Sequence, residues 1–313
     1  MHAMDELVRR IREKRNPSVI GLDTCLAHLP PKFARDHLRE LPNMEEAAQA
    51  IFDYNKALID ELYDIVPAVK VQAAYYEMYG PAGMVTFSRT LDYAREHGLT
   101  VMADVKRNDI GATAEAYAAA YLGQTTLGEG KASAFCADFA TVTPYLGEDG
   151  VLPFVRACEE HGGGIFVLVK TSNPSSGQLQ DMRVGGRTVY EMVGELVADW
   201  GRGLIGEEGY SAVGAVVGAT YPEQGANLRA RLPRTFFLVP GYGAQGAKGA
   251  ELAGCFDANG GGAIVNASRS ILCAWKTRPD MDFAHAAREE ALRMRDDLLA
   301  GLKAAGKEGA NPW

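Results

Sequence analysis

Short apolar runs recur along the chain, and the polar intervals between them are long enough to hold one helix each. A run of this kind, bounded by turn residues, is typical of a buried strand. The predicted strands are Ser18–Leu22, Ala68–Gln72, Thr100–Val105, Phe139–Thr143, Ile165–Lys170, Val213–Ala219, Thr235–Val239 and Ala263–Ala267. Helical spacing of apolar residues predicts helices over Met44–Tyr63, Gly83–His97, Ala112–Tyr121, Gly150–His161, Thr188–Trp200, Glu223–Leu232, Lys248–Ala253 and Asp282–Leu302.

Strand and helix thus alternate eight times, which predicts an α/β fold in the form of a (β/α)8, or TIM, barrel. A doubly wound parallel sheet is the alternative, but it would more often use fewer strands and a second domain. No linker or charge block divides the sequence, so we expect residues 1–313 to form a single domain. Residues 24–43 and 172–187 follow predicted strands and are expected to be elaborated loops on the face where barrel enzymes carry their sites.

Composition narrows the classes of partner. The chain is 47% hydrophobic and has a net charge of −8, with acidic and basic residues mixed throughout, which argues against nucleic acid or an anionic membrane as partner. Its five cysteines are scattered and form no C-x-x-C pair, which favours reduced thiols and no metal site. The charged N-terminal segment contains no secretory signal, and no apolar run approaches membrane-spanning length. We therefore expect a soluble cytoplasmic protein.

A polar segment, DVKRNDIGAT at residues 104–113, stands where predicted strand 3 ends. Side chains two apart on a strand share a face, so Asp104 and Lys106 should point the same way. Asp109 lies just past the strand, and a buried lysine between two carboxylates stays protonated. An isolated D-x-K pair is more often a solvated ion pair of small value. A catalytic role for Asp104 and Lys106 therefore depends on the whole string of residues 104–113 and on the residues at the ends of the other predicted strands.

Two more charged residues belong to neighbouring predicted strands: Asp23 directly follows strand 1, and Lys70 lies in strand 2. Lys70 lies within the apolar strand 2, where burial of an unpaired ammonium would be costly. It needs a carboxylate, and Asp23 or Asp104 could supply one. The alternative is a lysine that extends along the strand rim to water. With both aspartates nearby, the pattern favours a buried charge network at the carboxyl ends of the strands.

The loop after predicted strand 7, GYGAQG at residues 241–246, matches the dinucleotide fingerprint G-x-G-x-x-G. That fingerprint usually opens the first βαβ unit and is followed by an acidic residue at the end of the next strand. Here the loop is seventh in order, and Arg269 follows the next strand. Glycine-loop amides with an arginine form a phosphate site, and barrels place such sites after strands 7 and 8. The pattern favours a phosphate site over a nicotinamide site.

The string D-x-K-R-x-D-I-G-x-T resembles the active-site signature of the orotidine 5'-monophosphate decarboxylase family. The other strand-end residues match that family in order from Asp23 to Arg269, and the strings KRNDIG and TSNP are similar to its longer bacterial branch. The resemblance implies decarboxylation of orotidine 5'-monophosphate to uridine 5'-monophosphate in de novo pyrimidine biosynthesis. No cofactor is implied, and Lys106 is implied to donate a proton to C6 of the pyrimidine.

The resemblance also implies individual roles. The implied catalytic residues are Lys70, Asp104, Lys106 and Asp109. The implied substrate-binding residues are Asp23, Thr113, Ser172, Pro240, Gly243, Gln245, Ser268 and Arg269. In the family, Asp109 and Thr113 would come from the second subunit of a homodimer with shared active sites. Ser268 departs from many relatives, which have glycine before the final arginine, and Tyr242 is left without a role.

Two alternatives remain at this point. A magnesium-dependent sugar-phosphate aldolase or decarboxylase of a related barrel, such as a hexulose-phosphate synthase, shares the aspartate-lysine strand, and activity in excess chelator would distinguish it. A non-catalytic nucleotide-binding barrel would have no need of Asp104, Lys106 and Asp109 together.

Overall fold

The computed structural model describes residues 2–243 and 248–308. Within them, eight parallel strands close into a barrel in the order β1-β2-β3-β6-β7-β10-β11-β12, which confirms the predicted fold. The barrel strands are β1 (Ser18–Gly21), β2 (Ala68–Gln72), β3 (Thr100–Arg107), β6 (Phe139–Val142), β7 (Gly164–Lys170), β10 (Val213–Val217), β11 (Phe237–Pro240) and β12 (Ala263–Ala267). The predicted bounds lie within two residues of these, and those of β2 and β12 coincide with them.

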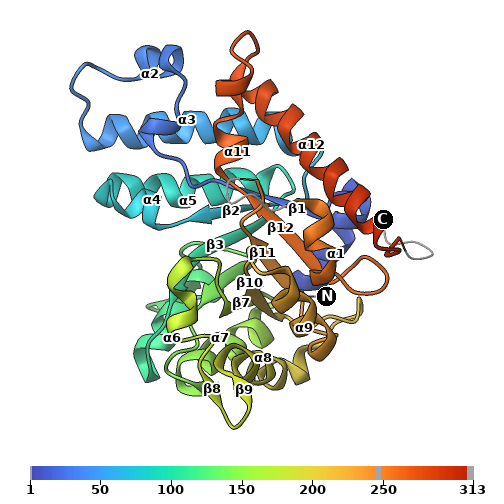
Figure 1. Cartoon of the computed structure of the whole chain (residues 1–313). Coiled ribbons are helices and arrows are strands. Elements are labelled where there is room, and N and C mark those ends of the chain that lie inside the picture. Colours follow the sequence, from blue (N-terminus) through green and yellow to red (C-terminus); the bar gives the residue numbers. More distant parts are fainter. Residues whose placement is uncertain (1, 244–247, 309–313) are drawn as a thin grey trace.

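The predicted helices cover the outside of the barrel. They are α3 (Met44–Leu62), α5 (Gly80–Glu96), α6 (Gly111–Tyr121), α7 (Glu148–His161), α8 (Val189–Trp200), α9 (Pro222–Arg231), α10 (Gly249–Leu252) and α12 (Phe283–Ala304). Helices α3, α5 and α12 lie on one side of the barrel, and α7, α8 and α9 lie on the other (Figure 1). Local chemistry sets some helix starts: Asn43 and Glu46 form a capping box at α3, and Thr188 and Glu191 form one at α8.

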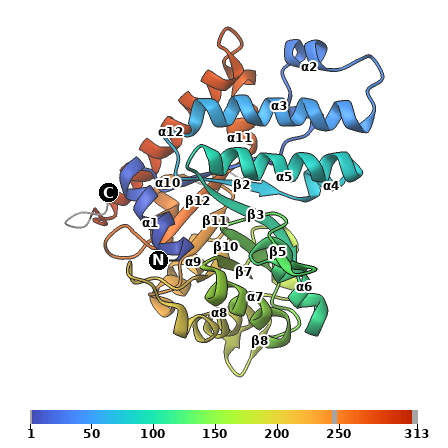
Figure 2. The same cartoon turned by 180° about the vertical axis from the view of Figure 1, so that it is seen from behind.

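The longest of the helices that were not predicted from the sequence lies before the first strand. Helix α1 (Ala3–Lys14) lies beside the barrel strands (Figure 2) and packs Met4, Leu7 and Ile11 against side chains of the barrel interior, including Phe139 and Phe166. Its apolar residues recur at helical spacing between charged ones, which is the pattern of an amphipathic helix. Helix α1 therefore closes the end of the barrel where the strands begin.

The two expected loop segments contain short elements. Residues 24–43 hold η1 (Leu26–His28) and α2 (Pro31–His37), and α2 projects away from the barrel (Figures 1 and 2). Residues 172–187 hold η2 (Pro174–Gln178) and most of a hairpin formed by β8 (Arg183–Val184) and β9 (Arg187–Thr188). The remaining elements are α4 (Ala74–Glu77), β4 (Thr125–Leu127), β5 (Gly130–Ala132), η3 (Arg202–Leu204), η4 (Ala253–Cys255), α11 (Arg269–Leu272) and η5 (Ala274–Thr277).

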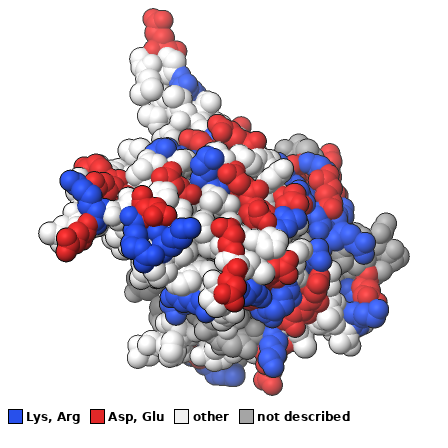
Figure 3. All heavy atoms as spheres, turned by 90° about the horizontal axis from the view of Figure 1, so that it is seen from above, with Lys and Arg blue, Asp and Glu red and all other residues white. Residues whose placement is uncertain are grey.

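The surface agrees with the mixed charge of the sequence. Lys and Arg side chains lie interspersed with Asp and Glu over the face shown in Figure 3. Among the helices of the described residues, none is long and apolar enough to cross a membrane.

Alternation along the strands divides the barrel interior into layers. Phe139 and Phe166 belong to the apolar cluster at the α1 end. Two residues further along the same strands, Thr141 and Leu168 line a pocket at the opposite end. Side chains two apart on a strand share a face. On β6 and β7, a shift of two residues therefore leads from the packed core to the wall of the candidate site.

Candidate active site

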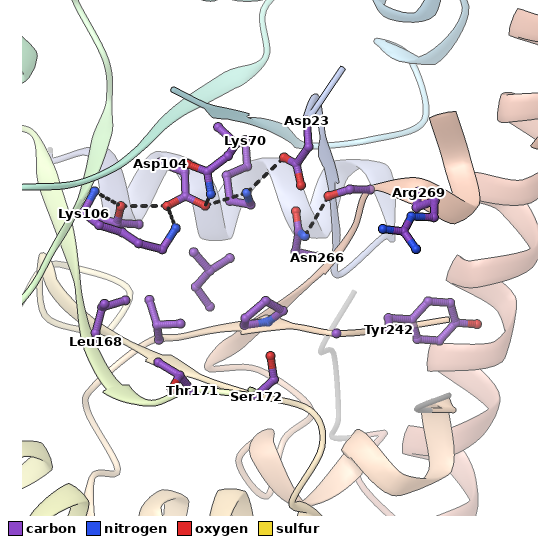
Figure 4. Close-up of a pocket in the computed structure, with 17 residues that line it drawn as sticks. Asp23, Lys70, Asp104, Lys106, Leu168, Thr171, Ser172, Tyr242, Asn266 and Arg269 are labelled. Carbon is purple, nitrogen blue, oxygen red and sulfur yellow. Dashed lines mark hydrogen bonds and ion pairs between the residues drawn. The ribbon is translucent and has the colours of Figure 1, made fainter. Parts of the chain in front are cut away.

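A cavity of about 430 Å³ opens at the carboxyl ends of the barrel strands, and each of these strands or the loop directly after it contributes to the wall. The lining residues are Asp23, Lys70, Gln72, Asp104, Lys106, Thr141, Leu168, Thr171, Ser172, Val216, Leu238, Pro240, Gly241, Tyr242, Asn266, Ser268 and Arg269. Figure 4 shows Asp23, which follows β1, and the charged side chains of β2 and β3 in one row, with Ser172 and Tyr242 across the cavity.

The row consists of alternating charges. Lys70 Nζ lies 2.7 Å from Asp104 Oδ2 and 3.5 Å from Asp23 Oδ1. Lys106 Nζ lies 2.5 Å from the other oxygen of Asp104, Oδ1. The side chains of Lys70 and Asp104 are only 5% and 8% exposed, so these charges interact in a medium that screens them poorly.

Asp104 uses both carboxylate oxygens fully. Besides the two lysines, Thr141 Oγ1 donates to Oδ1 at 2.9 Å and Gln72 Nε2 donates to Oδ2 at 3.1 Å. Burial alone would raise the pKa of Asp104, but the ammonium groups of Lys70 and Lys106 outweigh burial and hold the pKa well below its usual range. Asp104 therefore remains an anion throughout the neutral pH range.

Lys70 is held in the opposite charge state by the same contacts. Burial alone would lower the pKa of its ammonium, but the carboxylates of Asp104 and Asp23 outweigh burial, and the pKa lies above the usual range. The buried lysine between two carboxylates is therefore Lys70.

The sequence predicted that Lys106 would be buried between Asp104 and Asp109. Within a single chain this prediction was wrong. The Lys106 side chain is 44% exposed, and Asp104 is its ion-pair partner among the described residues. Asp109 instead accepts the backbone N–H of Ile110 at 2.8 Å. The expectation failed because β3 departs from regular strand geometry at Lys106, whose φ is +46°. The Lys106 ammonium consequently faces the open cavity.

The far end of the cavity carries the predicted phosphate residues. Arg269 and Ser268 line it, together with Pro240. Arg269 lies at the end of the row remote from Lys106 (Figure 4), and it has no ion-pair partner among residues 2–243 and 248–308. An unpaired guanidinium in a pocket is suited to bidentate contact with a phosphate.

The loop after β11 is only partly described. Gln245 lies outside the described residues, and Gly243, with φ of +72°, is exposed and is not among the lining residues. The ring of Tyr242 lines the cavity, but its hydroxyl donates to Asp297 Oδ2 on α12 at 2.8 Å. Tyr242 therefore fastens the start of this loop to α12.

Ser172 and its neighbour Thr171 line the opposite wall at the end of β7. Beneath them lies the fully buried Lys170, whose Nζ donates to Ser176 Oγ at 3.1 Å and pairs with Asp181 Oδ1 at 2.8 Å. Lys170 thus ties the following loop to the barrel. The sequence signal was a lysine in an otherwise apolar strand, as for Lys70, although Lys170 ends its strand and Lys70 lies in the middle of its own.

Asp109 and Thr113 do not line the cavity of their own chain. Thr113 is exposed in the first turn of α6. Exposed apolar side chains lie nearby in the sequence and at the end of the neighbouring strand: Ile110 is 55% exposed and Tyr145 is 76% exposed. Contiguous exposed apolar patches rimmed by polar residues mark protein interfaces, whereas single exposed apolar residues are common on any protein surface.

Four polar lining residues were missed in the sequence: three lie within strands, and the fourth, Thr171, directly follows β7. Gln72 and Thr141 bind Asp104, as described above. Asn266 is buried near the end of β12, and its Oδ1 has no hydrogen-bond partner within the described part of the chain. A signal was present, because each of the three lies on the inward face near the carboxyl end of a predicted strand. Without the barrel register, however, an uncharged polar residue at a strand end is not distinctive.

Comparison with known proteins gives matches over most of the chain. Residues 36–279 match the model of the orotidine 5'-phosphate decarboxylase / HUMPS family. The chain is 45% identical to an orotidine 5'-phosphate decarboxylase of Rhodopirellula baltica over 89% of this chain and 93% of that protein. It is 40% identical to one of Caldicellulosiruptor bescii over 95% and 98% of the two chains. The structure of Leishmania donovani OMP decarboxylase superposes with a TM-score of 0.73 at 30% identity, covering 97% of this chain and 99% of that one.

Proposed function

The chain belongs to the orotidine 5'-phosphate decarboxylase / HUMPS family, and we propose that it converts orotidine 5'-monophosphate to uridine 5'-monophosphate and CO2 in pyrimidine biosynthesis. The observation that carries the proposal is the alternating row Asp23-Lys70-Asp104-Lys106, which ends in an ammonium that faces the cavity. The magnesium-dependent sugar-phosphate alternative is not favoured, because the relatives at 40–45% identity are named as decarboxylases.

The cavity orients the substrate through its two ends. Arg269 and Ser268 would bind the phosphate, and Lys106 would meet the pyrimidine at the other end of the row (Figure 4). Asp23 lies between them and would accept a hydrogen bond from a ribose hydroxyl. Ser172, across the cavity, would contact the pyrimidine. Binding energy from the phosphate can then hold the carboxylate of the substrate against Asp104.

The chemical step breaks one carbon-carbon bond and forms one carbon-hydrogen bond. The bond from C6 to the carboxylate breaks, its electron pair stays on C6, and CO2 leaves. Lys106 stabilises the negative charge that develops on C6 and transfers its Nζ proton to that carbon, which yields uridine 5'-monophosphate. Solvent returns a proton to Lys106.

Electrostatics sets the size of the Lys106 contribution. An ammonium about 4 Å from the developing carbanion contributes roughly 4 kcal/mol at an effective dielectric constant near 20, or about a thousandfold in rate. Asp104 has all its acceptor positions occupied and a lowered pKa, so it stays charged beside the departing carboxylate. Repulsion between these two anions would add to the rate.

The test of this proposal compares Lys106→Ala with Lys131→Ala, whose lysine lies in the exposed β5. The loss of orotidine 5'-monophosphate absorbance is followed with purified proteins of equal circular dichroism. We expect kcat to fall at least about a thousandfold in Lys106→Ala and to stay unchanged in Lys131→Ala. Substantial turnover by folded Lys106→Ala would contradict the proton-donor role.

We also propose that the active sites are shared within a homodimer. Within residues 2–243 and 248–308, Lys106 has no second carboxylate partner, while Asp109 and Thr113 lie close in sequence to the exposed apolar Ile110. In a dimer these residues would reach the cavity of the partner. Mixing inactive Lys106→Ala with inactive Asp109→Ala subunits should restore activity in hybrid dimers, and no recovery after confirmed subunit exchange would count against shared sites.

The proposed enzyme is a single domain that acts in the cytoplasm. Helix α1 closes the start of the barrel, and the C-terminal α12 packs on α3 and β1, so both ends of the described chain belong to one body. The five cysteines are free thiols, which is usual in a reducing compartment.

A further inference from the structure

Strand β3 is irregular at the residues that carry the chemistry. Its pairing with β6 runs from Ala103 opposite Ala140 to Arg107 opposite Val142, so four steps along β3 match two along β6. Extra residues of this kind form a bulge, which re-aims a side chain and removes ladder hydrogen bonds. Thr141, in the middle of the β6 segment, faces this bulge.

The bulge contains an uncommon backbone conformation. Lys106 has φ of +46°, in the left-handed region that residues with a side chain rarely adopt. Such a conformation persists only where surrounding contacts hold it. Some group in the structure must therefore stabilise the backbone of Lys106.

That group is the hydroxyl of Thr141. Thr141 Oγ1 accepts the backbone N–H groups of Val105 and Lys106, each at 2.9 Å, and donates to Asp104 Oδ1 at 2.9 Å. A hydroxyl has one donor and two acceptor positions, so every position is used. Asp104 Oδ1 is also the atom that binds Lys106 Nζ. The single hydroxyl therefore holds Lys106 at both ends, through its amide and through the partner of its ammonium.

We propose that Thr141 is a positioning residue that sets the Lys106 ammonium against C6 of the substrate. The inference rests on the proposed decarboxylation. Loss of the hydroxyl leaves the backbone N–H groups of Val105, which is buried, and of Lys106 without this acceptor and frees the bulge to change conformation. The phosphate-binding residues Ser268 and Arg269 follow β12, away from this contact, so binding should suffer much less than the chemical step.

Two substitutions test the hydroxyl directly. Thr141→Val keeps the shape and removes the hydrogen bonds, whereas Thr141→Ser keeps the hydroxyl. Thr100→Val is a matched control, because Thr100 is equally buried at the other end of β3 and its Oγ1 has no hydrogen-bond partner among the described residues. Thermal unfolding and steady-state kinetics are measured for all three and for the wild type.

Misplacing a catalytic group by about 1 Å can cost about a hundredfold in rate. We expect Thr141→Val to lose about that much kcat with KM within about threefold, and Thr141→Ser to retain most of the wild-type kcat. Thr100→Val should match the wild type. Full kcat in Thr141→Val, equal losses in the Val and Ser variants, or a rise in KM as large as the fall in kcat would each overturn the proposal.

A structural readout separates this inference from the proposed function. Crystal structures of Thr141→Val and Thr100→Val should show Lys106 outside the left-handed region only in the former, whatever reaction the wild type performs. Retention of the Lys106 conformation in Thr141→Val would refute the positioning role. A wild type that fails to convert orotidine 5'-monophosphate would instead refute the proposed function. If Thr141→Val does not fold, Thr141→Cys, which keeps a weak acceptor at this position, is measured in the same way with the same criteria.

Discussion

Substitution of Lys70 by Met would remove the buried ammonium that separates Asp23 from Asp104, with little change in side-chain volume. At the 2.7 Å between Lys70 Nζ and Asp104 Oδ2, Coulomb's law with an effective dielectric constant of about 20 gives an attraction of about 6 kcal/mol. Part of this is offset, because the variant no longer buries an ammonium. Breaking a buried ion pair by removing one partner costs about 3–5 kcal/mol. Since Lys106 still pairs with Asp104, we expect a loss of about 3 kcal/mol in the free energy of unfolding.

The loss should depend on pH with a definite sign. In the wild type, the lysines hold the pKa of Asp104 below its usual range, so the ionised carboxylate stabilises the fold above the unfolded-state pKa of about 3.9 and this stability is lost as pH falls further. In Lys70→Met, the buried carboxyl has lost one of its two cations and its pKa rises. As pH falls, the Asp104 carboxylate of the variant therefore becomes protonated at a higher pH than in the wild type, and protonation removes the cost of burying an uncompensated charge. The difference between the two proteins should therefore shrink as pH falls from 7 towards about 4.

Urea unfolding at pH 7 and at pH 4.5, followed by tryptophan fluorescence at one protein concentration, measures this difference. Equal concentration matters because assembly would add to the apparent stability. Lys56→Met is the control, since Lys56 pairs with Asp60 on an exposed helix face and its loss should change little. A cost in Lys70→Met below about 1 kcal/mol at pH 7, or one that grows on acidification, would refute the reasoning.

Three further predictions concern the phosphate end, the β7 loop and the cysteines. Arg269→Ala should raise KM for orotidine 5'-monophosphate at least about tenfold without affecting binding of phosphate-free orotidine, and an unchanged KM would rule out the phosphate role. Lys170→Met leaves Asp181 without its ion pair, so limited proteolysis of the loop after β7 should accelerate; protection equal to the wild type would show that the pair does not order the loop. Burial raises the pKa of Cys158 to about 12 and that of Cys255 to about 11, so at pH 8 iodoacetamide should label the three half-buried cysteines and spare these two, as mass spectrometry of peptides would show.

Local pattern determined most of the architecture. The apolar runs of β2 and β12 and the periodic stretch of α3 could be placed closely, because strand and helix periods are properties of a short segment. Helix α1 was missed although its apolar spacing is helical. The sequence of a charged segment before the first strand does not indicate the surface against which the segment packs. Its burial depends on the end of a barrel that forms from the rest of the chain.

The residue types of the site were also visible in the sequence. Charged residues within or just after apolar strands, such as Lys70, Asp104 and Arg269, stand out because burial of a charge is costly without a partner. Eight of the twelve predicted site residues line one cavity. Asp109 and Thr113 lie outside it, as does Gly243, and Gln245 falls outside the described residues.

Only the tertiary structure decided which of these groups meet. Lys70 rather than Lys106 is the lysine held between two carboxylates, because barrel register brings Asp104 beside it from 34 residues away in the sequence. The roles of Thr141 and of the backbone at Lys106 depend on a bulge between β3 and β6. Periodicity along one strand specifies which face a side chain occupies, but the distance between side chains on different strands depends on pairing register and on closure of the sheet, which are set by the packing of the whole barrel.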